Sequence, residues 1–456
     1  MARALPIMKC KTSKMAKKNY FLLILLITVT FQCFAWPDIM TLHDCMEYAV
    51  SNSTKIKVQQ AETGDRRLEI RTAILSAFTP YVSASTSAYY NFGRSIDPQT
   101  NTYFNLTSFS NGYSLSASII LFDGFSAVNN IKISKTGLLI SQSTEKQIEA
   151  DICLAVMEAF YNVIYYKNLL EVYAGQIKTA EESLRLAERQ EELGLKGYAD
   201  VVQMEADLAN KQFDYINTKN QFQDQLMVLE SLIFWDEDKD LQISDELPQF
   251  YNETYDEEYI IDYAMNNNPE IKIARWNIDN SKRELRVAKW SLLPTVSLSG
   301  GWGTSFYTYS GSSNPGFGYQ FKNNRGEYVQ LGLSIPLYDR LTGVTNIKKK
   351  KHALDKAQYE LEQKMMDVQM EIKRAIQDCE GASESYTQAL KKSKVQEEAY
   401  RLNQKKLEQG LISTLEFQTA SNNYLRAKAD ELNSLFKFLI KKSVVKYYHG
   451  IEYINQ

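Results

Sequence analysis

The sequence predicts a mostly α-helical, internally duplicated chain that also contributes β-strands to a membrane barrel. Gly194 and Gly410 each interrupt a long segment with coiled-coil spacing of apolar residues, so we expect both at the tips of helical hairpins. The two glycines are 216 residues apart (410 − 194), and similar sequences recur near this offset along the chain. Each copy also contains segments of about ten residues in which apolar and small polar side chains alternate, as in transmembrane β-strands.

The duplication is clearest at both ends of the predicted strands. Ser118-Ile-Ile-Leu-Phe-Asp123 matches Ser334-Ile-Pro-Leu-Tyr-Asp339 in the second copy. Pro80 and Pro294 each lie between a helical pattern and a strand pattern. Proline suits a strand start better than a helix interior, so we expect both at the starts of strands. A period this long indicates duplication of one large unit rather than a solenoid of short repeats.

Both copies have the same order of predicted elements. Repeat 1 covers 36–232 and repeat 2 covers 256–449, with an acidic equatorial linker at 233–255 on the outside of the helices and a tail at 450–456. Repeat 1 contains a helix at 41–75, strands at 81–92 and 113–121, a long helix at 125–193 and a return helix at 198–232. Repeat 2 contains a helix at 256–292, strands at 295–309 and 328–337, a long helix at 343–409 and a return helix at 413–448. The segments 93–112 and 310–326 are rich in Asn, Ser, Thr and Gly, which predicts loops.

The N-terminus indicates export. Residues 1–35 have the pattern of a signal peptide, in which lysines precede an apolar core at 21–31 that is too short to span a membrane. Lipid attachment at Cys33 is the less favoured interpretation, because the preceding flank lacks the small residue usual before such a cysteine. The chain is therefore expected to act outside the cytoplasm.

Composition and spacing argue against nucleic-acid binding and against enzymatic chemistry. The formal net charge is −3, so there is no basic surplus to neutralise phosphates. The histidines are isolated, and no phosphate loop or nucleophile elbow is present, so we expect no catalytic residue, metal or cofactor. An odd set of three cysteines follows the signal segment and predicts packing residues rather than disulfides: Cys45, Cys153 and Cys379.

The predicted strands have one apolar face and one small polar face. In 113–121 every second residue is apolar and the alternate residues are serines; in 328–337, Leu333 lies on the apolar face and Ser334 on the other. A soluble sheet with one wet face is the alternative. The near absence of charge on the polar face favours a membrane barrel with lipid outside and a water-filled bore inside.

Four strands are too few to close a membrane barrel, for which eight is the smallest common number. An open sheet edge in lipid would leave backbone amides unpaired, at a cost of several kcal/mol each. A dimer would supply eight strands and almost no lumen, whereas a trimer would supply twelve and a bore. The strand count therefore predicts a trimer.

The signal peptide, the duplication, the Ser-Ile-x-Leu-aromatic-Asp strand ends and the paired glycine tips resemble the TolC family of outer-membrane efflux proteins. This resemblance implies a homotrimer with a shared 12-stranded barrel in outer-membrane lipid and a long coiled-coil α-helical tunnel in the periplasm of a Gram-negative-type bacterium. It also implies docking to a periplasmic adaptor protein and an inner-membrane pump, and passive conduction of small toxic compounds or drugs. A type I protein secretion duct is an alternative, and a secreted coiled-coil structural or adhesion protein is an alternative of another class.

The resemblance also implies a gate of carboxylates at the inner end of the tunnel. Glu416 matches the position of one such ring, six residues after the tip glycine, whereas Thr419 stands where the family has a second acid. The family's gate-closing tyrosine and arginine fall on Leu407 and Ile412. The residues by themselves also predict a capping box in which Glu416 bonds back to Ser413.

The hairpin tips have two interpretations. Asp200 holds the equivalent position in the first hairpin, so it is also a candidate gate residue, although an acid there favours the helix dipole as well. Gly194 and Gly410 are expected to form the turns, and Leu195 and Leu411 follow them directly at the tips. By resemblance the same residues contact the adaptor.

Overall fold

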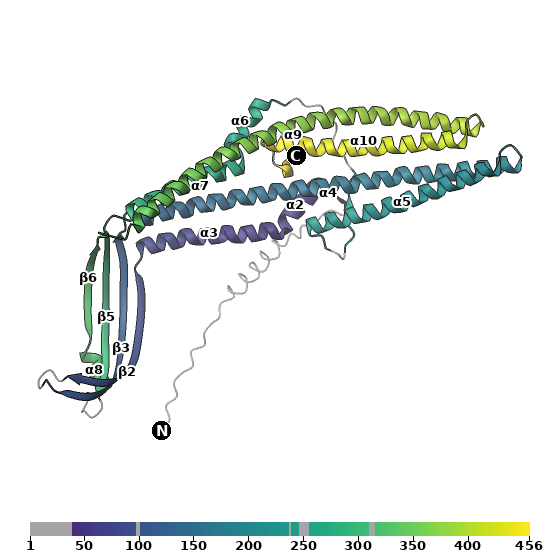
Figure 1. Cartoon of the computed structure of the whole chain (residues 1–456). Helices are drawn as coiled ribbons and strands as arrows, with labels where there is room; N and C mark the ends of the chain where they lie inside the picture. Colours follow the sequence, from purple (N-terminus) through teal and green to yellow (C-terminus); the bar gives the residue numbers. More distant parts are fainter. Residues whose placement is uncertain (1–38, 97–100, 237–238, 246–254, 310–314) are drawn as a thin grey trace, which may run out of the picture.

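The computed structural model describes residues 39–96, 101–236, 239–245, 255–309 and 315–456. It has two parts, a four-stranded antiparallel sheet and a bundle of long helices that extends away from one end of the sheet (Figure 1). The expected signal peptide at 1–35, with Cys33, lies outside the described residues.

The sheet has the strand order β2-β3-β5-β6. Its strands are β2 (Tyr81–Ile96), β3 (Tyr103–Phe122), β5 (Thr295–Tyr309) and β6 (Gly326–Ser334). Pro80 and Pro294 lie just before β2 and β5, as expected.

The predicted loop at 93–112 is wrong over most of its length. β2 and β3 continue their ladder from Phe92↔Thr107 to Ile96↔Tyr103, because a hairpin can pair Asn, Ser and Thr residues through its backbone. The predicted loop at 310–326 contains the helix α8 (Phe317–Asn323) and the start of β6. The strand predicted at 328–337 ends at Ser334 instead, since Pro336 lacks the amide hydrogen that a ladder needs.

The two faces of the sheet differ as the sequence predicts. Serines from adjacent strands meet on one face, where the Oγ atoms of Ser83 and Ser116 lie 2.9 Å apart and those of Ser85 and Ser114 lie 2.7 Å apart. The other face carries exposed apolar side chains such as Leu115, Leu331 and Leu333. One face is therefore suited to water and the other to an apolar environment.

The first helix of each repeat, predicted as continuous at 41–75 and 256–292, is broken in two. The segments are α2 (Leu42–Asn52) and α3 (Thr54–Phe78) in repeat 1, and α6 (Glu257–Asn267) and α7 (Pro269–Trp290) in repeat 2. Ser53 and Asn268 leave the helical region, with ψ of 125° and 129°. At the second break Pro269 disfavours a helical conformation at Asn268, whose side chain then caps α7 by accepting from Glu270 N at 2.8 Å.

Two long helical hairpins form the rest of the molecule. α4 (Ser126–Glu192) and α9 (Thr342–Glu408) have 67 residues each, about 100 Å at 1.5 Å per residue. The return helices are α5 (Tyr198–Ile233) and α10 (Thr414–Tyr448), and both tips lie at the same end of the bundle (Figure 1). None of the helices in the described ranges combines the length and the apolar character needed to span a bilayer.

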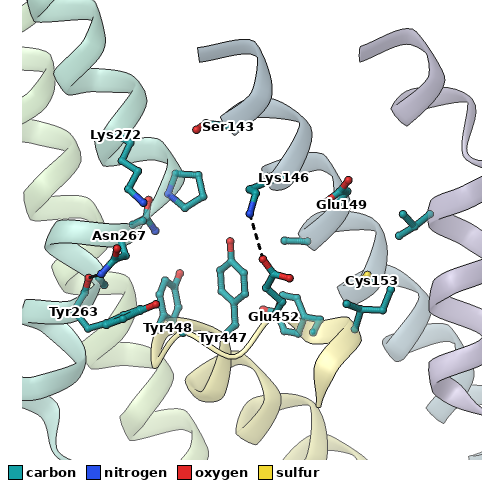
Figure 2. A pocket seen from close by; sticks show the side chains of 18 residues that line it. Ser143, Lys146, Glu149, Cys153, Tyr263, Asn267, Lys272, Tyr447, Tyr448 and Glu452 are labelled. Atoms are coloured by element: carbon teal, nitrogen blue, oxygen red, sulfur yellow. Dashed lines mark hydrogen bonds and ion pairs between the residues drawn. The ribbon is translucent and has the colours of Figure 1, made fainter. Parts of the chain in front are cut away.

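The linker and the C-terminal tail both pack on the middle of the bundle. In the linker, β4 (Gln242–Ile243) pairs in parallel with β1 (Ile39–Met40). The tail contains η1 (Tyr453–Asn455), whose Tyr453 ring stacks on Tyr447 with centroids 4.7 Å apart. Beside it, Lys146 and Glu452 form an ion pair at the edge of a cavity of about 250 Å³ (Figure 2). The tail thus packs against the equatorial region of the protomer and does not extend away from it.

The main hydrophobic core lies in the same equatorial region. It contains Val156 and Ile164 of α4, Leu229 of α5 and Ile372 of α9, together with the three cysteines. Cys45, Cys153 and Cys379 are buried and free, which confirms that they are packing residues. Burial raises the pKa of the Cys45 and Cys153 thiols to about 12, so they remain uncharged.

Candidate functional site

The two hairpin tips have the same backbone geometry. Gly194 and Gly410 have φ of +71° and +72°, a left-handed conformation that L side chains rarely adopt. The amides of Leu195 and Leu411 each donate to a carbonyl five residues earlier, at 2.8 Å, which closes the helix ends in Schellman-type turns. The turn-forming role is therefore confirmed. Leu195 and Leu411 are 72% and 69% exposed, so both project from the tips.

Glu416 forms the expected capping box. Its amide donates to Ser413 Oγ at 3.2 Å, and the Ser413 amide donates to Glu416 Oε2 at 3.1 Å. Glu416 and Thr419 are exposed, whereas Phe417 and Gln418 between them are buried. The side chains of Glu416 and Thr419 therefore lie on the face of α10 that turns away from its packed neighbours.

Asp200 lies in the first turn of α5, as expected from the helix dipole, and also joins the two hairpins. Thr414 Oγ1 donates to Asp200 Oδ1 at 3.2 Å, so the contact links the first turns of α5 and α10. The two acids at equivalent positions of the repeats thus differ: Glu416 caps its own helix, and Asp200 reaches the other hairpin.

A reciprocal pair of amide side chains continues this contact one turn further. Gln203 Nε2 donates to Gln418 Oε1 at 2.9 Å, and Gln418 Nε2 donates to the Gln203 carbonyl at 3.0 Å. Gln418 is 8% exposed, so the pair lies inside the contact between α5 and α10. The hydrogen bonds require a fixed register of the two helices.

A buried ion pair forms the next level of the contact. Lys211 Nζ lies 3.4 Å from Asp207 Oδ1, and the two side chains are 4% and 8% exposed. Lys211 also donates to Ser421 Oγ at 3.0 Å, and Ser421 donates to Gln176 Oε1 at 2.7 Å. Three helices, α4, α5 and α10, are therefore joined through one charged side chain.

An apolar cluster lies beside these polar contacts near the tips. Its buried members are Ala187, Met204, Leu407 and Phe417, and Ile412 and Tyr400 pack against them. The Tyr400 ring stacks on Phe417 with centroids 5.7 Å apart, and burial raises the pKa of its hydroxyl. Leu407 and Ile412 thus join the hairpins by apolar packing where the resemblance implies a tyrosine and an arginine.

A family model described as outer membrane efflux protein matches residues 47–233 and 260–437, which cover most of both repeats. The chain belongs to the outer membrane efflux protein family. It is accordingly an outer-membrane protein and a channel component rather than an enzyme, which confirms the resemblance. Membership also removes the alternative of a secreted structural or adhesion protein.

The similar proteins are distant from this chain in sequence. The alkaline protease secretion protein AprF of Pseudomonas aeruginosa is 24% identical over 264 residues, and the match spans 56% of this chain and 52% of that protein. The outer membrane protein VceC of Vibrio cholerae superposes with a TM-score of 0.74 at 14% identity, over 90% of this chain and 96% of that one. The CmeC outer membrane channel of Campylobacter jejuni superposes with a TM-score of 0.73 at 16% identity, over 91% and 85%. The fold is therefore shared almost end to end.

The polar contacts between the two hairpins are not evident from the sequence. Gln418 interrupts the apolar seam of the return helix, which is the one local signal. Lys211 and Asp207 are spaced i, i+4 like many solvated pairs on helix surfaces, so the sequence does not distinguish them as buried. Among the described residues no group of His, Cys, Asp and Glu could hold a metal ion.

We predict that Lys211→Met destabilises the contact between the hairpins by about 3–5 kcal/mol, because it leaves the Asp207 carboxylate buried without a partner. Hydrogen exchange of the α10 amides near Ser421 should rise accordingly. Lys211→Met with Asp207→Leu should regain most of the loss, since it removes both charges. Lys392→Met breaks an exposed pair with Asp430 and should cost less than about 1 kcal/mol. Equal exchange in the single and double variants would contradict this prediction.

Proposed function

We propose that three copies of this chain form a passive exit duct through the outer membrane. The observation that supports it most strongly is the geometry of the sheet. Its edge strands β2 and β6 each pair with a single neighbour, and the sheet has one serine-rich and one apolar face. Three such sheets joined edge to edge would give a twelve-stranded barrel with the serines inside. The hairpins of three copies would continue the bore into the periplasm.

The tips are the proposed docking surface for a periplasmic adaptor protein. Leu195 and Leu411 are exposed apolar residues at the far end of the molecule from the sheet, where a partner from the inner membrane would arrive. An inner-membrane pump would then supply the energy, since the chain has no site for its own chemistry in the described residues. Opening of the duct would separate the hairpins at the contact between α5 and α10.

The test is the assembly state and conductance of the purified protein. Extraction from outer membranes in detergent should yield a trimer, and this trimer should form water-filled channels in planar bilayers. A monodisperse soluble monomer would overturn the proposal. A trimer that forms no conducting channel would equally contradict the proposal, because it would indicate a structural assembly and not a duct.

The cargo is proposed as small toxic compounds, with secreted polypeptides as the second candidate. AprF is named as a secretion protein, and its similarity to this chain is the observation that favours the second. Deletion of the gene should increase sensitivity to drugs and dyes if the first candidate is right. An unchanged sensitivity together with loss of a secreted protein from the medium would establish the second.

A further inference from the structure

Strand β6 is much shorter than the strand at the opposite edge of the sheet. β6 has 9 residues and β2 has 16, and both meet the helical bundle at the same end of the sheet, where β2 follows α3 and β6 leads to α9. If their inner ends are aligned in an edge-to-edge pair, the outer seven residues of β2 (16 − 9), Tyr90–Ile96, extend beyond β6. The chain places α8 just before β6, at the outer end of the sheet (Figure 1).

α8 occupies the edge of β5 where β6 is missing. Gln320 is 2% exposed; its Oε1 accepts from the Tyr307 amide at 3.1 Å, and its Nε2 donates to the Tyr307 carbonyl at 2.8 Å. Asn324 Nδ2 donates to the Ser305 carbonyl at 2.8 Å. Ser305 and Tyr307 are two residues apart, so their backbone groups point to the same edge of β5. The side chains of Gln320 in α8 and Asn324 beside it thus supply the backbone hydrogen bonds to β5 that a longer β6 would supply.

Aromatic contacts fix α8 on the apolar face of the sheet. The ring centroids of Phe317 and Phe306 are 5.3 Å apart, and those of Phe321 and Tyr113 are 5.4 Å apart. Tyr113 shares its face with Leu115, since it lies two residues before it in β3. Tyr319 lies away from these contacts and is 66% exposed.

The uncovered end of β2 has exposed aromatic residues on this same face. Tyr90 pairs with Phe109 in β3, and Phe109 has the same strand parity as Tyr113. Tyr90 and Phe92 are 64% and 74% exposed. The isolated protomer therefore presents exposed aromatic side chains on the outer ends of two different edges.

We propose that α8 is a clamp between subunits, which packs its Tyr319 side against the outer end of β2 in a second copy of this chain. The inference rests on the proposed trimer. Joining β6 to β2 of the next copy brings α8 beside the seven residues that β6 does not reach, and aromatic pairs of this kind stabilise a contact beyond the area they bury. The clamp would close the barrel wall where the strands alone leave a gap.

The test is cross-linking of a double variant, Tyr319→Cys with Phe92→Cys, by a short bismaleimide in isolated outer membranes. Covalent dimers and trimers are expected on denaturing gels. Tyr319→Cys with Val82→Cys places the second cysteine on the same face at the inner end of the same strand and should give monomers only, as should each single variant. Monomers only from the first double variant, in membranes where the native chain is trimeric, would overturn the clamp and place Tyr319 against lipid. Absence of trimers in the native chain would instead overturn the proposed function, and the clamp with it.

A second measurement tests the hydrogen bonds that hold α8. Gln320→Leu leaves the Tyr307 amide without its acceptor, so hydrogen exchange at this amide should rise about tenfold or more, and trimers should dissociate at a lower temperature. Asn323→Ala is the control, because the Asn323 side chain is exposed and bonds within α8 to the Tyr319 carbonyl. Trimers of Gln320→Leu that dissociate at the same temperature as the control would overturn the role of α8 in holding subunits together.

Discussion

Leu331→Arg should abolish assembly of the protein in the outer membrane, whereas Gln330→Arg in the same strand should be tolerated. Leu331 is 69% exposed on the apolar face of β6 and lies next to its middle residue. An arginine facing lipid costs about 2–4 kcal/mol at the midplane of the bilayer and less toward the interfaces, and three symmetric copies would each bear the cost at the depth of Leu331. Gln330 pairs with Ser299 on the serine-rich face, where an arginine would meet water.

Leu333 provides a depth control for the same prediction. It shares the apolar face with Leu331 but lies one residue from the end of β6, where the cost of arginine falls toward about 0–1 kcal/mol. Leu333→Arg should therefore reduce assembly less than Leu331→Arg, and Ser334→Arg should reduce it least. The measurement is the fraction of each variant that migrates as a heat-modifiable trimer in outer-membrane fractions. Equal loss with Gln330→Arg and Leu331→Arg would show that the faces are assigned wrongly.

The large architecture was predictable because it depends on periodicity. The hairpins, their tips and the positions of the four strands follow from coiled-coil spacing, alternation and two glycines. These signals extend over many residues, so single exceptions do not obscure them. The duplication helped further, since a weak pattern in one repeat could be checked against its copy.

The elements that the sequence predicts wrongly are those whose structure depends on backbone hydrogen bonds or on a single residue. The outer part of the β2–β3 hairpin has loop-like composition, but its ladder uses main-chain groups that composition does not report. The break at Asn268 follows from Pro269, which the helical periodicity on both sides conceals. The helix α8 has only seven residues, about two turns. This is too short to establish a helical period, so the sequence predicts a loop there.

The candidate site likewise has features that the sequence predicts and features that it does not. Local geometry at Glu416 was predictable, because a capping box spans four consecutive residues. The contacts of Asp200 and Lys211 were not, because their partners Thr414 and Ser421 lie more than 200 residues away in the sequence. Which residues lie between the hairpins depends on the packing angle of whole helices, and the sequence of one helix does not specify that angle.

Glu416→Gln should markedly weaken the cation preference of the channel, and also its block by multivalent cations, in planar-bilayer recordings. In a trimer, threefold symmetry would bring three Glu416 carboxylates to one height around the axis, and a ring of acids in a narrow aperture attracts cations. Thr419 offers no second charge, so this one ring would supply most of the field. The neutral variant should fold normally, because glutamine also serves at the third position of a capping box and can accept from the Ser413 amide.

Asp200→Asn is the matched control, because it removes the acid at the equivalent position of the other repeat. Its side chain bonds to Thr414 across the contact between hairpins, and asparagine can still accept that hydrogen bond. Asp200→Asn should therefore change selectivity less than Glu416→Gln. If both variants retain the native selectivity, Glu416 acts only as a helix cap and the narrowest part of the bore lies elsewhere. If Asp200→Asn has the larger effect, α5 rather than α10 lines the aperture, because only an acid that faces the bore can set its field.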